Sequence, residues 1–163
     1  MLTGGCQCGA IRYEVDGEAG HHALCHCADC RASSGAPATA WLGVPSDAFC
    51  VRKGEATAFN SSGASWRYFC GTCGTGLYFI NEEMLPGIID IQSATLDDAH
   101  IHFPKVHIQT AERLSYMSDL ASLPEFERFP GPLRDLSAGQ RQQIADALGR
   151  ISVAERVVGA RHG

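Results

Sequence analysis

Short runs in which apolar and polar residues alternate fill most of the first 130 positions of the chain. In segment 10–15, the apolar residues Ile11, Tyr13 and Val15 alternate with charged ones, the period of a strand with one buried face. Similar runs follow, separated by glycine, serine and proline, at 39–44, 48–52, 56–59, 65–69, 76–80, 88–92 and 105–108. This spacing predicts a mainly β fold built from antiparallel sheets.

The pattern changes after Pro130 and Pro132. We therefore expect one β domain over residues 1–132 and a C-terminal helical extension over residues 133–163.

A short amphipathic helix is predicted at 138–149 within this extension. Ser137 followed by Gln140 is the start of a capping box. Apolar residues then recur at helical spacing, namely Ile144, Ala147, Leu148 and Ile151. We expect this stripe to lie on the domain or on a partner subunit. In the second case the protein would be a homodimer.

Composition and charge exclude several classes of protein. The chain has 163 residues, of which 45% are hydrophobic and 19% charged, as in ordinary globular domains. It has no apolar run of the length that crosses a membrane, and its start lacks the pattern of a secretory signal. The net charge of −5 without a basic stripe argues against a nucleic-acid partner. We therefore expect a cytoplasmic protein with neither a membrane nor a nucleic-acid partner.

Eight cysteines are many for a chain of this kind. Because the cytosol keeps thiols reduced, they indicate metal binding or redox chemistry and not disulfides. Seven of them form three clusters: Cys6-x-Cys8, Cys25-x-Cys27-x-x-Cys30 and Cys70-x-x-Cys73. Cys50 stands alone.

The first and last clusters together have the ligands for a structural zinc site. A structural zinc ion takes four ligands, and neither a CxC nor a CxxC pair can supply four. We therefore predict that Cys6, Cys8, Cys70 and Cys73 bind one zinc ion. This site would tie the start of the chain to its middle.

The middle cluster has the ligand count of a catalytic zinc site. Three protein ligands leave a position for water or substrate. We predict that Cys25, Cys27 and Cys30 bind a second zinc ion in this way.

Three alternatives remain open. Cys70 and Cys73 could form a redox pair, although the sequence after them predicts a strand and thioredoxin-like pairs precede a helix. All the cysteines could form one binuclear cluster, or Cys50 or His26 could close the three-cysteine site. We expect instead that Cys50 is a buried or half-buried thiol and that His26 points away from the metal. We also expect His21 and His22 to face solvent from a loop.

Three segments resemble the glutathione-dependent formaldehyde-activating enzyme family, whose domain the centromere protein V group shares. They are GGCQCGAIRYEV at 4–15, CHCADCRASSGAPATAW at 25–41 and FCGTCGTGLYF at 69–79. The later segments DIQSATLDDA at 90–99, KVHI at 105–108 and LPEFERFP at 123–130 follow in the family's order. The resemblance thus covers residues 3–130. It implies a β-tent of antiparallel sheets, with a structural and a catalytic zinc at the cysteines assigned above.

The implied activity is that of a carbon–sulfur lyase, an S-hydroxymethylglutathione synthase-like enzyme. A small thiol such as glutathione would add to formaldehyde or a related small aldehyde at the open zinc site, with no catalytic residue beyond the metal ligands. Candidate substrate contacts after the cluster are Arg31, Ser34 and Gly35, and further candidate cations are Lys53, Arg67 and Lys105. The alternative is a non-catalytic module that binds zinc or a thiol.

Elemental analysis tests the metal assignment. Protein purified without chelator should contain two zinc ions per chain. One zinc ion or none would contradict the assignment.

Overall fold

The computed structural model of the chain describes residues 1–123, 125–128 and 131–149. The chain divides into two units, Met1–Met117 and Ser118–Gly163, and each is described by itself. Pro130, Ile151 and part of segment 123–130 lie outside the described residues. The domain boundary predicted after residue 132 stays a prediction.

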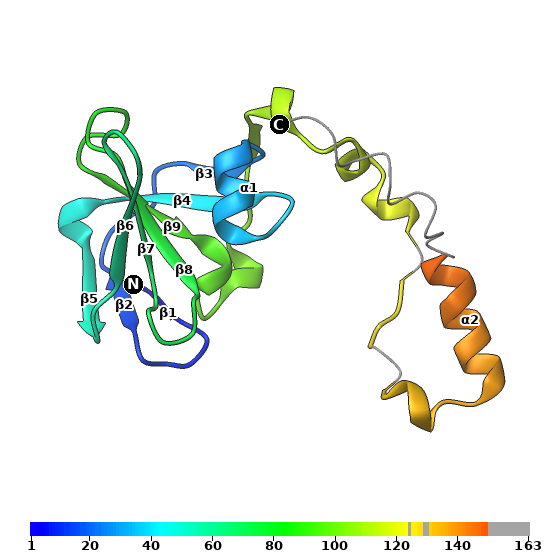
Figure 1. The fold of residues 1–163 in the computed structure, drawn as a ribbon. Coiled ribbons are helices and arrows are strands. Elements are labelled where there is room, and N and C mark those ends of the chain that lie inside the picture. Colours follow the sequence, from blue (N-terminus) through cyan, green and yellow to red (C-terminus); the bar gives the residue numbers. More distant parts are fainter. Residues whose placement is uncertain (124, 129–130, 150–163) are drawn as a thin grey trace. The chain divides into compact units, whose positions relative to one another are not determined.

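Two sheets make up the first unit (Figure 1). The smaller is antiparallel and has the order β1 (Leu2–Gly5), β2 (Arg12–Val15), β5 (Phe49–Lys53). The larger has seven strands in the order β10 (Val106–Ile108), β3 (His22–Cys25), β4 (Thr39–Pro45), β9 (Ile88–Gln92), β8 (Gly76–Ile80), β7 (Ser65–Phe69) and β6 (Thr57–Ser62).

The predicted mainly β fold is confirmed, with two corrections. All eight predicted runs are strands, but the sequence pattern missed β1 and β3. One strand pair also departs from the predicted antiparallel arrangement, because β10 pairs with β3 in parallel, with His107 opposite Leu24. A short edge strand that returns to the sheet after a long connection has no local signal for its direction.

Side chains from both sheets share one core. Tyr13 and Val15 of the small sheet pack in the same cluster as Val44, Leu77 and Ile91 of the large one, and all are almost fully buried. The phenol of Tyr13 also hydrogen-bonds the Thr95 hydroxyl at 2.7 Å. The two sheets are therefore held together mainly by apolar burial, which contributes roughly 25 cal/mol per Å².

The first unit contains one α-helix, α1 (Ala28–Ser34), which packs beside β4 (Figure 1). The sequence pattern does not predict this helix, because seven residues with a single buried position show no helical periodicity. Short 3₁₀ turns lie at Ser46–Ala48, Ser93–Thr95, Ala99–Ile101, Thr110–Glu112, Ser115–Ser118, Leu120–Ser122 and Leu133–Asp135.

The predicted C-terminal helix is confirmed as α2 (Ala138–Leu148). The Ser137 hydroxyl accepts a hydrogen bond from the Gln140 N–H, and the Gln140 side chain accepts one from the Ser137 N–H. Of its apolar stripe, Ile144 is buried whereas Leu148 is 68% exposed. What the stripe covers stays a prediction. Within the described residues, no helix has both the length and the apolar character to cross a membrane.

Replacement of Ile91 by alanine tests the shared core. Ile91 is fully buried on β9, so Ile91→Ala should lower the free energy of unfolding by about 3 kcal/mol. Ile101→Ala is the control, because Ile101 is 58% exposed and should change stability little. Denaturant titration of both variants measures the difference. Equal losses would show that Ile91 does not lie in a tightly packed core.

Candidate metal centres

Two loops bring Cys6, Cys8, Cys70 and Cys73 together. Cys6 follows β1 of the small sheet, and Cys70 follows β7 of the large sheet. The four sulfur atoms all lie within 4.8 Å of one another. This group therefore joins the two sheets at one point, across 62 residues of sequence between Cys8 and Cys70.

Glycines in the left-handed conformation shape both loops. Gly9 follows Cys8 with φ of 71°, and its N–H donates to the Cys6 carbonyl. Gly74 follows Cys73 with φ of 76°, and its N–H donates to the Cys70 carbonyl at 2.8 Å. A side chain at either position would strain the turn, so glycine allows each loop to close tightly behind its sulfur atoms.

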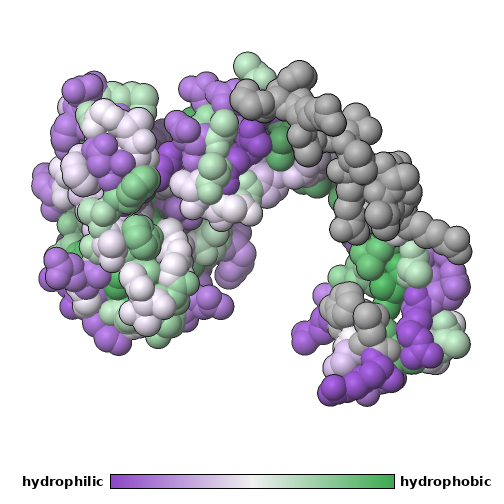
Figure 2. Space-filling model, viewed as in Figure 1, coloured by the Kyte–Doolittle hydropathy of each residue, from purple (hydrophilic) through white to green (hydrophobic). Residues whose placement is uncertain are grey.

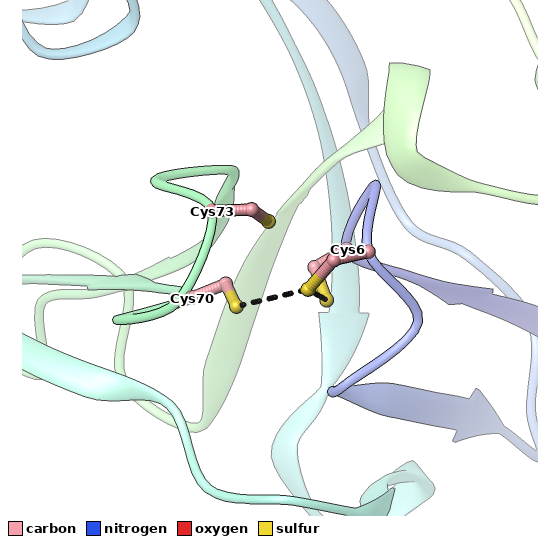
Figure 3. Close-up of side chains that lie close together, drawn as sticks. Cys6, Cys70 and Cys73 are labelled. Carbon is pink, nitrogen blue, oxygen red and sulfur yellow. Dashed lines mark hydrogen bonds between the residues drawn. The ribbon is translucent and has the colours of Figure 1, made fainter.

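The distances between the sulfur atoms fit a tetrahedral metal site. The Cys6 and Cys8 sulfurs are 3.5 Å apart, and those of Cys8 and Cys70 are 3.8 Å apart. Four sulfurs at zinc–sulfur distances near 2.3 Å form a tetrahedron with edges of about 3.8 Å. In Figure 3 the side chains of Cys6, Cys70 and Cys73 converge from the two loops. This group could therefore hold one metal ion with four thiolates.

Cys25, Cys27 and Cys30 form a second, separate group of sulfur atoms that also lie within 4.8 Å of one another. Cys25 ends β3, Cys27 caps the N-terminus of α1, and Cys30 lies in its first turn. The Cys27 sulfur accepts a hydrogen bond from the Cys30 N–H at 3.3 Å. The strand end and the helix start thus place three sulfurs together within six residues.

Burial and mutual repulsion keep the protons on two thiols of this second group. Burial, followed by the neighbouring thiols Cys30 and Cys27, raises the pKa of Cys25 to about 12. Burial also raises the pKa of Cys30. In the four-cysteine group, hydrogen bonds from the Thr75 side chain and backbone lower the pKa of Cys73 to about 6. A bound cation would lower the pKa values of the thiols in the second group, because it stabilises their thiolate forms.

The three-cysteine group lines a cavity of about 430 Å³, whereas the four-cysteine group does not line it. Trp41, Arg67, Phe79 and Asp90 contribute to its walls. A neighbouring cavity of about 630 Å³ shares Asp29, Trp41 and Arg67 with it. Figure 2 shows apolar and weakly polar residues side by side in the middle of the visible face of the first unit. A ligand in the first cavity could therefore reach the three sulfurs, and its volume of about 430 Å³ suits a small organic molecule.

Residues 1–112 match the glutathione-dependent formaldehyde-activating enzyme family. The chain belongs to this family. A crystal structure of a Rhodobacter sphaeroides protein from structural genomics is 21% identical to the chain, with a TM-score of 0.53. The match covers 64% of this chain and 98% of that protein, and at this identity it supports the fold alone. Comparison with curated proteins gave no match.

The three residues predicted to contact substrate lie around α1 of this family domain. The Arg31 guanidinium donates to the His26 carbonyl at 3.2 Å. The Ser34 hydroxyl donates to the Cys30 carbonyl at 2.8 Å, and Gly35 ends the helix with φ of 63°. Each thus has a local structural role, and substrate contact by these residues stays a prediction.

Of the other candidate cations, Arg67 lines both of these cavities, and Lys53 and Lys105 line neither. The Lys53 ammonium donates to the Gly9 carbonyl at 2.7 Å, near the four-cysteine group. The Lys105 ammonium lies over the Phe103 ring, 3.6 Å from its centre.

Two sequence-based expectations about single residues are wrong. His22 was expected to face solvent, but it is buried in β3 and its ring bonds the Ser93 hydroxyl at 2.9 Å. Cys50 was expected to be buried or half-buried, but it is exposed on the edge strand β5. Its neighbours Phe49 and Val51 take the inner face of that strand, as the alternation requires.

Neither His26 nor Cys50 belongs to the three-cysteine group. The fully buried His26 ring instead bonds the His107 ring at 2.9 Å.

His21 and Asp90 both line the cavity of about 430 Å³ and bond to each other, a contact that the sequence pattern does not predict. Their side chains are 2.6 Å apart, and His21 passes over Gly43 to reach β9. A side chain at position 43 would collide with the imidazole ring. No local signal predicts this pair, because its members are 69 residues apart.

Removal of the charge from Asp90 and from Asp97 should change the stability of the protein in opposite directions. Burial raises the pKa of Asp90, so its ionisation opposes folding and the contribution of this group to stability should fall as the pH rises from about 4 to neutral. Hydrogen bonds from Arg12 and Thr3 lower the pKa of Asp97, so its ionisation favours folding. At pH 7, Asp90→Asn should raise the melting temperature by a few degrees, and Asp97→Asn should lower it. Melting curves from pH 4 to 8 measure this; shifts of the same sign would contradict it.

Proposed function

We propose that the chain is a zinc-dependent carbon–sulfur lyase that adds a small thiol, glutathione or a close analogue, to formaldehyde or a related small aldehyde. The observation that supports this most is the three-cysteine group that lines a cavity of about 430 Å³. Membership of the formaldehyde-activating family supports the same reaction.

We propose zinc as the metal at both cysteine groups, two ions per chain. Sites made only of thiolates bind zinc or iron–sulfur clusters. The addition of a thiol to an aldehyde involves no redox change, so the redox-inactive zinc ion suits it. In the four-cysteine group every tetrahedral position is filled by protein, so that ion has a structural role. In the three-cysteine group one position stays available to a ligand from the cavity.

The metal and the residues around the three-cysteine group would have different roles in this reaction. When bound there, zinc supplies Lewis acidity that lowers the pKa of a substrate thiol and yields a thiolate near neutral pH. Cys25, Cys27 and Cys30 hold the ion at the cavity wall. The indole N–H of Trp41 donates to the Cys30 sulfur at 3.4 Å and fixes that ligand. Trp41 and Phe79 also give this wall an apolar surface that limits water around the reacting atoms.

Exchange spectroscopy by NMR tests this function against the spontaneous reaction. Glutathione and formaldehyde should exchange with S-hydroxymethylglutathione at least about tenfold faster with the zinc-loaded chain than without it. Thiol binding without acceleration would favour the alternative, a non-catalytic thiol-binding module. Absence of both would contradict the two functions together.

Two serine variants should separate the roles of the two groups. Cys70→Ser should prevent stable folding, because a structural zinc ion contributes on the order of 10 kcal/mol in small domains and here joins two sheets. Cys27→Ser should keep the fold, because its ion closes only a short loop, yet lose thiol binding. Zinc content, melting curves and calorimetry with glutathione measure both. A Cys27→Ser variant that keeps two zinc ions, or unfolds as Cys70→Ser does, would contradict the assignment.

A further inference from the structure

Arg67 reaches from β7 to the three-cysteine group. Its Nη2 atom lies 3.9 Å from the Cys30 sulfur, and its guanidinium lies over the Phe79 ring, 5.2 Å from the ring centre. Strand pairing places Arg67 opposite Phe79 on β8, so the ring and the sheet hold the long side chain in one direction. The guanidinium is therefore a fixed positive group beside the Cys30 sulfur.

One end of this guanidinium has no hydrogen-bond partner. The Nη1 atom is buried and unpaired among the described residues. Arg67 also forms none of the ion pairs found in that part of the chain, and Asp90 in the same cavity is bonded to His21. A buried donor without a partner costs about 1–3 kcal/mol. The guanidinium therefore has donor capacity that the described residues leave unused, in a side chain that lines both cavities.

The proposed reaction creates an acceptor of this kind. As the thiolate sulfur attacks the aldehyde carbon, a carbon–sulfur bond forms and the carbon–oxygen π bond breaks. Its electron pair moves to the oxygen, which becomes an alkoxide two bonds from the sulfur. A proton from solvent, equal to the one that the thiol released, then gives the neutral S-hydroxymethyl product. The cavity that admits the thiolate to the three sulfurs is also lined by Arg67.

We propose that Arg67 is a catalytic residue whose guanidinium stabilises the alkoxide formed on the aldehyde oxygen. This inference rests on the proposed function. An arginine keeps its charge throughout, so it can donate hydrogen bonds to the oxygen without serving as the proton source. Preorganised donors at a developing oxyanion typically contribute about 10²- to 10³-fold to kcat.

A carboxylate of the thiol is the competing acceptor for Arg67. The two roles differ in which kinetic constant they change. Loss of an alkoxide donor lowers kcat for every thiol, whereas loss of a carboxylate partner raises KM for thiols that carry a carboxylate. A thiol without a carboxylate, 2-mercaptoethanol, therefore distinguishes them.

The experiment compares Arg67→Gln and Arg67→Lys in the zinc-loaded full chain, with Arg52→Gln as the matched control. Arg52 also lies on a strand and loses the same charge, but it pairs with Glu14 and lines neither cavity. With 2-mercaptoethanol and formaldehyde, Arg67→Gln should lower kcat about 100-fold while zinc content and thiol affinity, measured by calorimetry, stay within a few-fold. Arg67→Lys should recover part of kcat, and millimolar guanidinium should partly rescue Arg67→Ala.

Several results would overturn the inference. An unchanged kcat with a raised KM for glutathione alone would make Arg67 a carboxylate-binding residue. Loss of zinc in both Arg67→Gln and Arg67→Lys would make it a group that only positions Cys30. An active wild type with an equally active Arg67→Gln would overturn this inference alone, whereas an inactive wild type would overturn the proposed function and the inference with it.

Discussion

The convergence of four sulfur atoms from two distant loops is the constraint on which the rest of the molecule depends. Cys6 and Cys8 follow a strand of the small sheet and Cys70 and Cys73 follow a strand of the large one, so this group links sheets that otherwise meet mainly through apolar packing. Cys70 directly follows β7, the strand that also carries Arg67. The four-cysteine group therefore holds one end of the strand from which Arg67 reaches the Cys30 sulfur.

The two cysteine groups differ in what surrounds them more than in their ligand chemistry. The four-cysteine group lies between two tight glycine turns and has a full set of four sulfurs. The three-cysteine group lies at a strand end and a helix start, and one side of it is a cavity wall. A tetrahedral ion would be enclosed by protein in the first case and open to a ligand in the second. The Trp41 indole and the Arg67 guanidinium add donors beside Cys30.

Features that depend on neighbours in sequence were predictable, and those that depend on distant contacts were not. Strand alternation identified eight of the strands, and cysteine spacing predicted which side chains the structure brings together, although metal binding itself stays a prediction. The burial of His22 depends on Ser93, and the choice of Arg67 among four candidate cations depends on Phe79 and Cys30. The parallel pairing of β10 and the short helix α1 likewise have no local pattern to reveal them.

X-ray absorption at the zinc edge of the full chain tests most directly whether one cysteine group is closed and the other open. We expect two zinc ions per chain with, on average, between three and four sulfur neighbours each at about 2.3 Å. Addition of a small thiol should raise this average to four, because only the three-cysteine site can accept another sulfur. An average of four before the thiol is added, or one that the thiol leaves unchanged, would contradict the account.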